Sequence, residues 1–446
     1  MSKQGLIQYL CIMSNDKITL KGVARIATPV IISEFLEEAL ILTDSILLSY
    51  KPDVYLASVG IIDAILLIIL AYGVALNDSY QNFFARYENQ DLVTVLAIFK
   101  NAWKKFLCSG VAIAILILSL TQLGILFANS NNIIACVNQS IWFILPLALL
   151  SYTSMWLNSF LMGLGHVKLL SIVSICCVFV NGLCGYFLLF KVKSTLTPTS
   201  IILLTSALSE LLAVAIMWIY IRKRYHHREN GTKIRHQKLL SRTFSLASIY
   251  PALSEIGFHI GSLVLFIFCT YFFPQNQVAL LSLIFSYWGL MQVPVDGLQE
   301  ISLNYFAKLY SNREMKSFLS YSRQLIRFAR GCCIILFVIV ITSDLLFEDW
   351  SNIKFQGIIL VFLISLFACG TEIFNTSLIV RLKNDSYMIG KLIFAILATG
   401  LVLIGRFLLH VETILSILCP FLLAQIAENV YCSIRAKTVW LKSRGI

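Results

Sequence analysis

The chain has 446 residues, of which 58% are hydrophobic and 13% charged, with a mean hydropathy of +0.82 and a formal net charge of +12. This composition excludes an ordinary soluble globular protein and indicates a polytopic membrane protein. The twelve cysteines are scattered through apolar segments without disulfide or zinc spacing. They predict small core residues, and neither a metal nor another cofactor is expected.

Apolar segments of about 20 residues, the length that crosses a bilayer, recur along the whole chain. They predict twelve transmembrane helices near residues 24–49, 56–80, 104–128, 133–160, 168–190, 198–221, 243–272, 278–304, 325–346, 355–379, 386–408 and 412–434. The first of these segments lacks the cleavage site of a secretory signal, so the chain is expected to insert uncleaved. The fold class predicted is therefore an all-α membrane protein.

The distribution of Lys and Arg predicts the orientation, because basic residues remain on the cytoplasmic side. With both termini cytoplasmic, few basic residues fall near outer loops: Lys51, Lys191, Lys193, Lys354 and Arg406. We therefore expect a multi-pass protein of the plasma or inner membrane. The basic segment 222–238 is interpreted as a solvated cytoplasmic linker, with contact to anionic lipid as the alternative, and no nucleic-acid partner is expected.

An internal repeat divides the chain into two halves. NFFAR (82–86) corresponds to NYFAK (304–308) at an offset of 222 residues, and Asp78 corresponds to Glu300 at the same offset. Two tandem halves with six spans each are predicted to be related by an axis along the membrane normal and to enclose a cavity. The predicted parts are an N-lobe of helices 1–6 (1–222), a basic linker (223–241) and a C-lobe of helices 7–12 (242–446).

The first predicted span is unusual because it carries four carboxylates, Glu34, Glu37, Glu38 and Asp44, within an arc of roughly 120° on a helix. Charges inside a membrane usually face the bundle interior or water. Asp44 lies deepest, which favours a functional role, whereas Glu34 and Glu38 are equally consistent with a wet helix end.

The other predicted spans add to this acidity. Eight further carboxylates lie within or at the edges of the spans: Asp63, Asp78, Glu210, Glu255, Asp296, Glu300, Glu372 and Glu428. No Lys or Arg is predicted at comparable depth. Such an interior attracts cations, so the expected cargo is cationic.

Two smaller groups of residues could bind substrate or relay protons. Glu255 and His259 have helical i, i+4 spacing, and such a pair can exchange protons near physiological pH; a structural hydrogen-bonded pair is the alternative. Asp296 and Glu300 share this spacing, and nearby Pro294 could break the helix or only kink it. No phosphate-binding loop, metal-ligand spacing or readable catalytic triad is present in the sequence, so an enzyme is not predicted.

Several segments resemble the multidrug and toxic compound extrusion (MATE) transporters, whose superfamily also includes flippases of lipid-linked oligosaccharides. The similar segments are IATPVIISEFLEEALILTDSILL with Asp44 fifteen residues after Pro29, YLASVGI (55–61), the NFFAR and NYFAK motifs, FLMGLGHVK (160–168), LIVRLKNDS (378–386) and Asn181 in the fifth span. The resemblance covers essentially the whole chain. It implies a V-shaped bundle of two lobes, alternating access, and export of organic cations in exchange for H⁺ or Na⁺.

The resemblance has departures at the expected ion ligands. Gly185 stands where many members carry an Asp, His259 stands where many carry a Glu, and Glu372 lies two positions from Gly370, where some members carry an Asp. Na⁺ requires several oxygen ligands, whereas a proton requires one titratable group. These departures favour H⁺ over Na⁺ as the coupling ion.

We therefore predict a monomeric secondary exporter of amphipathic, cationic small molecules. Ion coupling is assigned to Asp44, Asn181 and Glu37, and substrate binding or proton relay to Glu255, His259, Asp296, Glu300 and Glu372. One alternative is a flippase for a lipid-linked sugar or an exporter of a peptide natural product with the same fold. A membrane scaffold or channel is a further alternative, but it would require neither the repeat nor the carboxylates of the first span.

Overall fold

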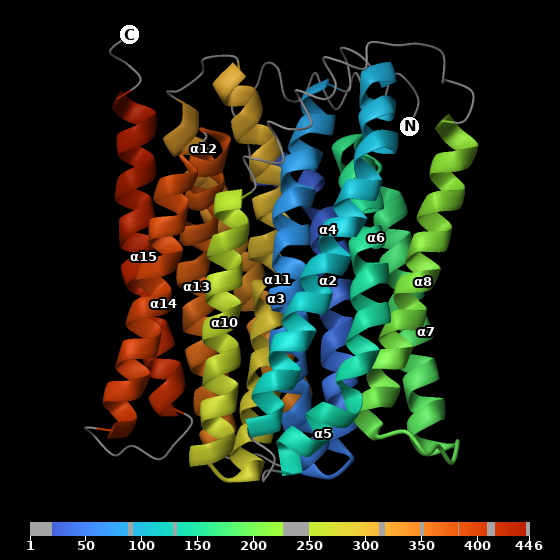
Figure 1. Cartoon of the computed structure of the whole chain (residues 1–446). Helices are drawn as coiled ribbons and strands as arrows, with labels where there is room; N and C mark the ends of the chain where they lie inside the picture. Colours follow the sequence, from blue (N-terminus) through green and yellow to red (C-terminus); the bar gives the residue numbers. More distant parts are fainter. Residues whose placement is uncertain are drawn as a thin grey trace.

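A computed structural model describes residues 20–87, 92–127, 132–225, 249–311, 317–347, 352–381, 383–407 and 415–442. Within these ranges the structure is helical and contains no strand (Figure 1). The helices are α2 (Leu20–Ser49), α3 (Asp53–Tyr87), α4 (Leu92–Phe127), α5 (Asn132–Ser140), η1 (Ile141–Phe143), α6 (Ile144–Gly163), α7 (Val167–Phe190), α8 (Pro198–Tyr225), α10 (Ile249–Phe272), α11 (Gln275–Ser311), α12 (Phe318–Phe347), α13 (Asn352–Val380), α14 (Asn384–Phe407) and α15 (Leu415–Lys442).

The predicted all-α membrane fold is confirmed. Eleven helical segments of the described chain are long and apolar enough to cross a membrane, with α5, η1 and α6 together forming one of them. Helix α2 has 30 residues and is also long enough to cross, but its charged residues set it apart from the apolar helices. Large apolar side chains such as Leu116, Phe179 and Ile396 are exposed on the outside of the bundle, where lipid solvates them.

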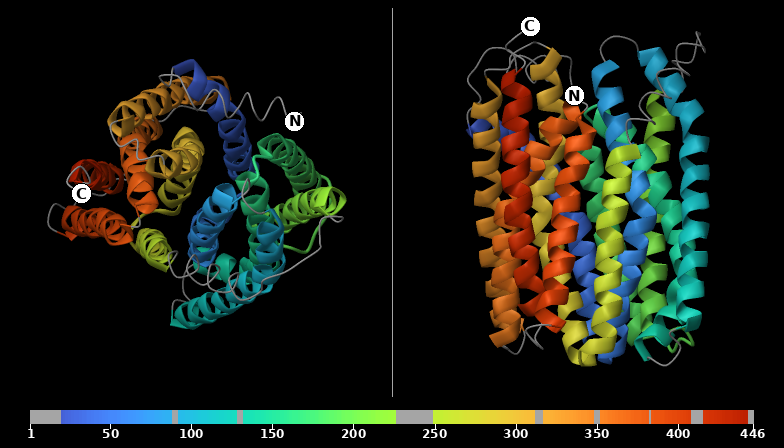
Figure 2. Two further views of the ribbon diagram at one scale, coloured as in Figure 1. Left: turned by 90° about the horizontal axis from the view of Figure 1, so that it is seen from above. Right: turned by 60° about the vertical axis from the view of Figure 1, so that its left-hand side comes forward.

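The helices form two groups that follow the order of the chain. Seen along the bundle axis, α3–α8 lie on one side and α10–α15 on the other, with α2, which we count with the first group, at the boundary between them (Figure 2). Helix α2 packs against α7 of its own group and α11 of the other, and α3 packs against α10 and α11. The exact lobe boundaries stay a prediction, because all but residues 223–225 of the predicted linker fall outside the described residues.

The turn between α6 and α7 explains part of the FLMGLGHVK segment. Gly165 has a φ of 72°, a left-handed conformation that favours glycine. The backbone N–H of His166 bonds to the carbonyl of Leu161 at 2.8 Å, and that of Gly165 to Met162 at 2.9 Å. These bonds satisfy carbonyls at the end of α6, as in a Schellman motif.

Helix α11 continues through Pro294, so the possible helix break is not found. The residue that matters for packing is Gly297. A Cβ atom added there would lie 3.2 Å from Cα of Ile31 on α2. The absence of a side chain thus lets α2 and α11 approach closely, as small residues do between membrane helices.

Candidate functional site

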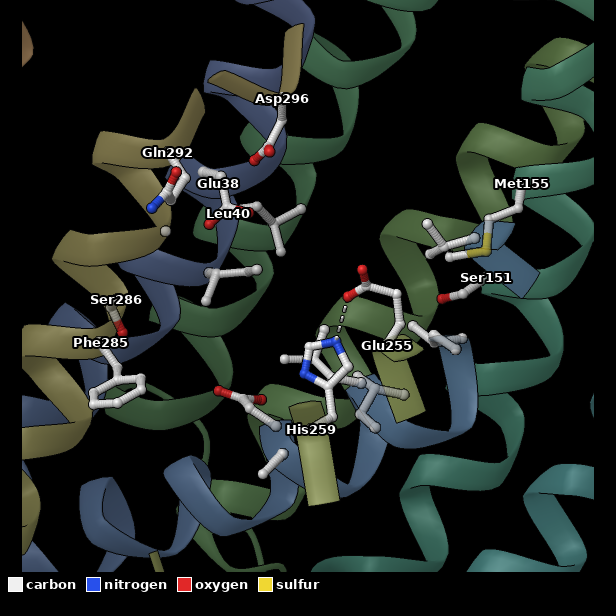
Figure 3. Close-up of a pocket in the computed structure, with 18 of the residues that line it drawn as sticks. Glu38, Leu40, Ser151, Met155, Glu255, His259, Phe285, Ser286, Gln292 and Asp296 are labelled. Atoms are coloured by element: carbon white, nitrogen blue, oxygen red, sulfur yellow. Dashed lines mark ion pairs between the residues drawn. The ribbon is translucent and has the colours of Figure 1, made fainter. Parts of the chain in front are cut away.

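A cavity of about 730 Å³ lies between the two groups of helices and is lined by residues from both. Nine carboxylates line it: Glu38, Asp44, Asp63, Asp78, Glu210, Glu255, Asp296, Glu372 and Glu428. Figure 3 shows Glu38, Gln292 and Asp296 on one wall, with Glu255 and His259 across the open space. The predicted accumulation of carboxylates therefore surrounds one shared volume.

Asp44 forms the centre of the N-lobe part of the site. Its Oδ1 atom accepts a hydrogen bond from Asn181 Nδ2 at 2.7 Å, and its Oδ2 atom accepts one from Ser206 Oγ at 3.0 Å. The structure thus brings together Asp44 and Asn181, which are 137 residues apart in the chain. Ser206 on α8 was not predicted, because a serine in a membrane helix has no distinctive sequence pattern.

Gly185 of α7 faces an apolar side chain of α2, the helix that carries Asp44. A Cβ atom at Gly185 would lie 3.0 Å from Cδ1 of Leu47 and 3.9 Å from Oγ1 of Thr205. The aliphatic side chain of Leu47 therefore occupies space beside Gly185, where the resemblance described above led us to expect an acidic side chain. Among the described residues, the carboxylate of Asp44 accepts side-chain hydrogen bonds from Asn181 and Ser206.

Two residues predicted to belong to the site have no described side chain. Glu37 lies in α2 and Glu300 in α11, but both side chains are outside the described residues. Their neighbours are placed: Glu38 lies against Gly289 of α11, and Asp296 lines the cavity one turn before Glu300. Glu38 is thus located at the boundary between the two groups of helices.

Glu255 and His259 of α10 face the cavity, together with Ser262. Nε2 of His259 lies 4.0 Å from Oε2 of Glu255 (Figure 3). The other Glu255 oxygen, Oε1, accepts a hydrogen bond from the hydroxyl of Tyr387 on α14. Tyr387 was missed because only the packing of α14 against α10 brings the two residues together.

Lys391 corrects the expectation that no basic residue lies at depth. Its Nζ atom is 2.8 Å from Oε1 of Glu372 and 3.8 Å from Oε1 of Glu255, and it lines the cavity. The sequence placed Lys391 at the cytoplasmic face because it lies about two turns from the start of α14. A lysine side chain extends several ångströms from its backbone, and here it points into the bundle.

Further polar side chains complete the C-lobe part of the site. Oε2 of Glu372 accepts a hydrogen bond from Asn375 Nδ2 at 3.4 Å. Oε2 of Glu428 accepts one from Gln425 Nε2 at 3.2 Å, and the same nitrogen lies 3.0 Å from Oγ1 of Thr371. Helices α10, α13, α14 and α15 therefore all contribute to one polar cluster.

The two groups of helices contact each other at the end of the bundle where α2 ends and α3 begins, which we call the sealed end. The hydroxyls of Ser45 on α2 and Ser286 on α11 are 2.8 Å apart. Gly60 of α3 also packs closely against the other group of helices, because a Cβ atom added there would collide with Phe266 of α10 and Ser282 of α11. The other lining residues extend toward the opposite end of the helices, as far as Pro251 and Tyr387.

No group of three or more His, Cys, Asp or Glu side chains within the described ranges has an arrangement that could hold a metal ion. The cysteines described there are free thiols, and Cys108 and Cys419 are exposed, so the prediction that the cysteines are core residues is wrong for these two. The polar groups that line the cavity include nine carboxylates, several of which accept hydrogen bonds, and the ammonium group of Lys391, a set that suits binding of protons or organic cations.

Comparison with known proteins gives a consistent result. The MatE family model matches residues 29–187. A MOP superfamily transporter from Pyrococcus furiosus aligns with a TM-score of 0.73 and 15% identity over 98% of each chain. Curated protein sequences give no match.

Two conformations of a multidrug resistance MATE family transporter of the MOP superfamily also share this fold. The outward-facing form aligns with a TM-score of 0.69 and 16% identity, covering 96% of this chain and 98% of the other. The inward-facing form aligns with a TM-score of 0.67 and 15% identity, covering 92% and 96%. At this level of identity, the similarity establishes the fold.

Proposed function

We propose that this chain belongs to the MATE family and is a secondary exporter of amphipathic organic cations that works by alternating access. The match of the family model over residues 29–187 and the shared fold support this assignment. The observation that carries the proposal is the cavity between the lobes, which nine carboxylates and one lysine line. Such a charge distribution attracts cations and repels anions. Apolar lining residues such as Phe258 and Phe285 would accommodate the rest of an amphipathic molecule.

Protons are the coupling ion that the site favours. Asp44 has two hydrogen-bond donors as partners, and Leu47 fills space beside Gly185. A Na⁺ site would need several oxygen ligands around the ion, whereas one carboxyl group is sufficient for a proton. Protonation of Asp44 would cancel its attraction for a cationic substrate and bias the lobes toward the other opening, as alternating access requires.

The membrane orientation belongs to the same proposal. With the termini and the basic segment 222–238 in the cytoplasm, the sealed end faces outward and the cavity extends toward the cytoplasm. This conformation would accept cargo from inside the cell. The protein is expected to act as a monomer in the cell membrane, since each chain carries both lobes.

The experiment is transport in proteoliposomes with an imposed pH or Na⁺ gradient and ethidium as the cargo. Asp44→Asn keeps the shape and hydrogen-bonding capacity of the side chain but cannot ionise, so we expect proton-driven transport to be lost. Asp53→Asn is the matched control, because Asp53 is exposed at the start of α3. Near wild-type transport by folded Asp44→Asn would refute the coupling role, and a strict Na⁺ requirement would refute the proton assignment.

The flippase alternative receives less support from the cavity. A lipid-linked pyrophosphate carries several negative charges and needs unpaired cationic side chains. Among the residues that the structure describes, Lys391 is the one Lys or Arg that lines the cavity, and its ammonium is paired with Glu372 at 2.8 Å. Transport of an anionic lipid, but not of ethidium, would reverse this preference.

A further inference from the structure

The C-lobe polar cluster holds its own ammonium group. Lys391 lies within 4 Å of two carboxylates, Glu372 and Glu255, and its side chain is 15% exposed. Its Nζ atom is also 5.9 Å from the ring centroids of Phe258 and Tyr387. Two carboxylates and two aromatic rings around one ammonium are the chemical environment that binds an alkylammonium ligand.

The cluster contains more negative groups than Lys391 can neutralise. Glu428 is 2% exposed and lines the same cavity, and its carboxylate interacts electrostatically with the ammonium of Lys391. Its Oε1 atom accepts no hydrogen bond of good geometry from the described residues. His259, 4.0 Å from Glu255, is the other titratable group of α10 that faces the cluster. Because an unpartnered buried carboxylate oxygen is costly, this arrangement has capacity for another donor.

A tethered ammonium competes strongly with free cations. Attachment to the chain gives it an effective concentration of millimolar or more at the carboxylates. A small hydrated ion that replaced it would have to leave its water shell and gain no apolar contact. An amphipathic organic cation gains contact with the apolar wall at the same time, so it can displace the lysine where Na⁺ cannot.

We propose that Lys391 is a tethered occupant of the C-lobe polar cluster, which excludes Na⁺ and yields only to an organic cation that replaces it at Glu372 and Glu255. The proposal rests on the proposed function and assigns to Lys391 the choice of ligand. The displaced ammonium would move to Glu428, whose free oxygen offers a second position. Glu372 and Glu255 thus have a cationic neighbour whether or not cargo is bound.

The test measures binding of two probes, ethidium and ²²Na⁺, to purified protein in nanodiscs. We expect wild type to bind ethidium and no ²²Na⁺. Lys391→Met should bind ethidium at least tenfold more tightly and gain ²²Na⁺ binding, because the competitor is removed. Lys391→Gln should show the same gains, and its amide can still donate to Glu372 if the methionine variant fails to fold.

Three controls separate this idea from a general change of charge. Lys391→Arg keeps the tethered cation and should show neither gain. Lys383→Met removes an exposed lysine just before α14 and should also behave as wild type. Lys391→Met combined with Glu372→Gln should lose both gains.

The outcomes also distinguish this inference from the proposed function. The inference would be overturned if Lys391→Met and Lys391→Gln fold but show neither tighter ethidium binding nor new ²²Na⁺ binding. Ethidium binding by wild type would in that case leave the exporter proposal intact. If wild type binds no ethidium but the variants gain ²²Na⁺, the tethered-cation role stands and the cargo class is wrong.

Discussion

The hydrogen bond between Ser45 and Ser286 gives a quantitative test of alternating access. It joins the two groups of helices at the sealed end, with the hydroxyl oxygens 2.8 Å apart in a buried position. Ser45→Ala removes this bond but leaves no buried hydroxyl without a partner, because Ser286 still donates to the carbonyl of Ser282 at 3.2 Å. The loss should therefore weaken the sealed conformation without a large penalty elsewhere.

Side-chain hydrogen bonds between membrane helices contribute about 0.6 kcal/mol on average. At room temperature this energy corresponds to about a threefold change in the ratio of two conformations. We therefore expect Ser45→Ala to raise the ratio of open to sealed molecules about threefold at this end of the protein.

The ratio can be measured by electron paramagnetic resonance distances between spin labels on unnatural amino acids. Tyr50 and Tyr271, both exposed near the sealed end, are suitable positions, and such labels avoid the native cysteines. Ser49→Ala is the matched control, since its hydroxyl bonds within its own helix to the carbonyl of Ile46. An unchanged distance distribution in Ser45→Ala would show that this contact does not hold the lobes together.

Three further changes test separate parts of the structure. Trp156→Ala should destabilise the protein by about 3–5 kcal/mol in detergent unfolding, because Trp156 is 2% exposed and stacks on Phe99; Trp156→Phe should cost much less, and equal losses would contradict this packing role. His259→Ala should weaken the response of transport to pH or shift it to alkaline values if the Glu255–His259 pair relays protons, and an unchanged profile would indicate a structural role. Burial, followed by the charge of Arg224, lowers the pKa of His166 in the α6–α7 turn to about 4, so its contribution to stability should be lost as pH falls from about 6.5 to about 4; thermal unfolding of His166→Gln should lack this part of the pH dependence.

The helices could be predicted from the sequence because each span carries its own hydropathic signal. The acidic lining could also be predicted, since burying a carboxylate in lipid is costly and only an interior position is tolerable. The pairing of Asp44 with Asn181 needed the family resemblance, because 137 residues separate them and neither residue indicates its partner.

Other features of the site depend on packing that a single sequence does not reveal. Ser206 and Tyr387 are ordinary residues of membrane helices until a neighbouring helix brings a carboxylate to them. Lys391 was misplaced because hydropathy locates a residue along the membrane normal but does not say in which direction a long side chain extends. Glu37 and Glu300 stay predictions, since their side chains lie outside the described residues.

The buried carboxylates of the two lobes have different partners, and this difference bears on the proposed transport cycle. Asp44 is stabilised by neutral donors, so its charge can be cancelled only by a mobile ion or by cargo. Glu372 is stabilised by the ammonium of Lys391, so its charge is already balanced within the protein. A proton taken up at Asp44 changes the net charge of the cavity, whereas an exchange of Lys391 for a cationic cargo leaves the local balance at Glu372 unchanged. On the proposals made above, uptake of the coupling proton is assigned to Asp44 in the N-lobe and selection of the cargo to Lys391 in the C-lobe, and the His259→Ala experiment tests whether the C-lobe also relays protons.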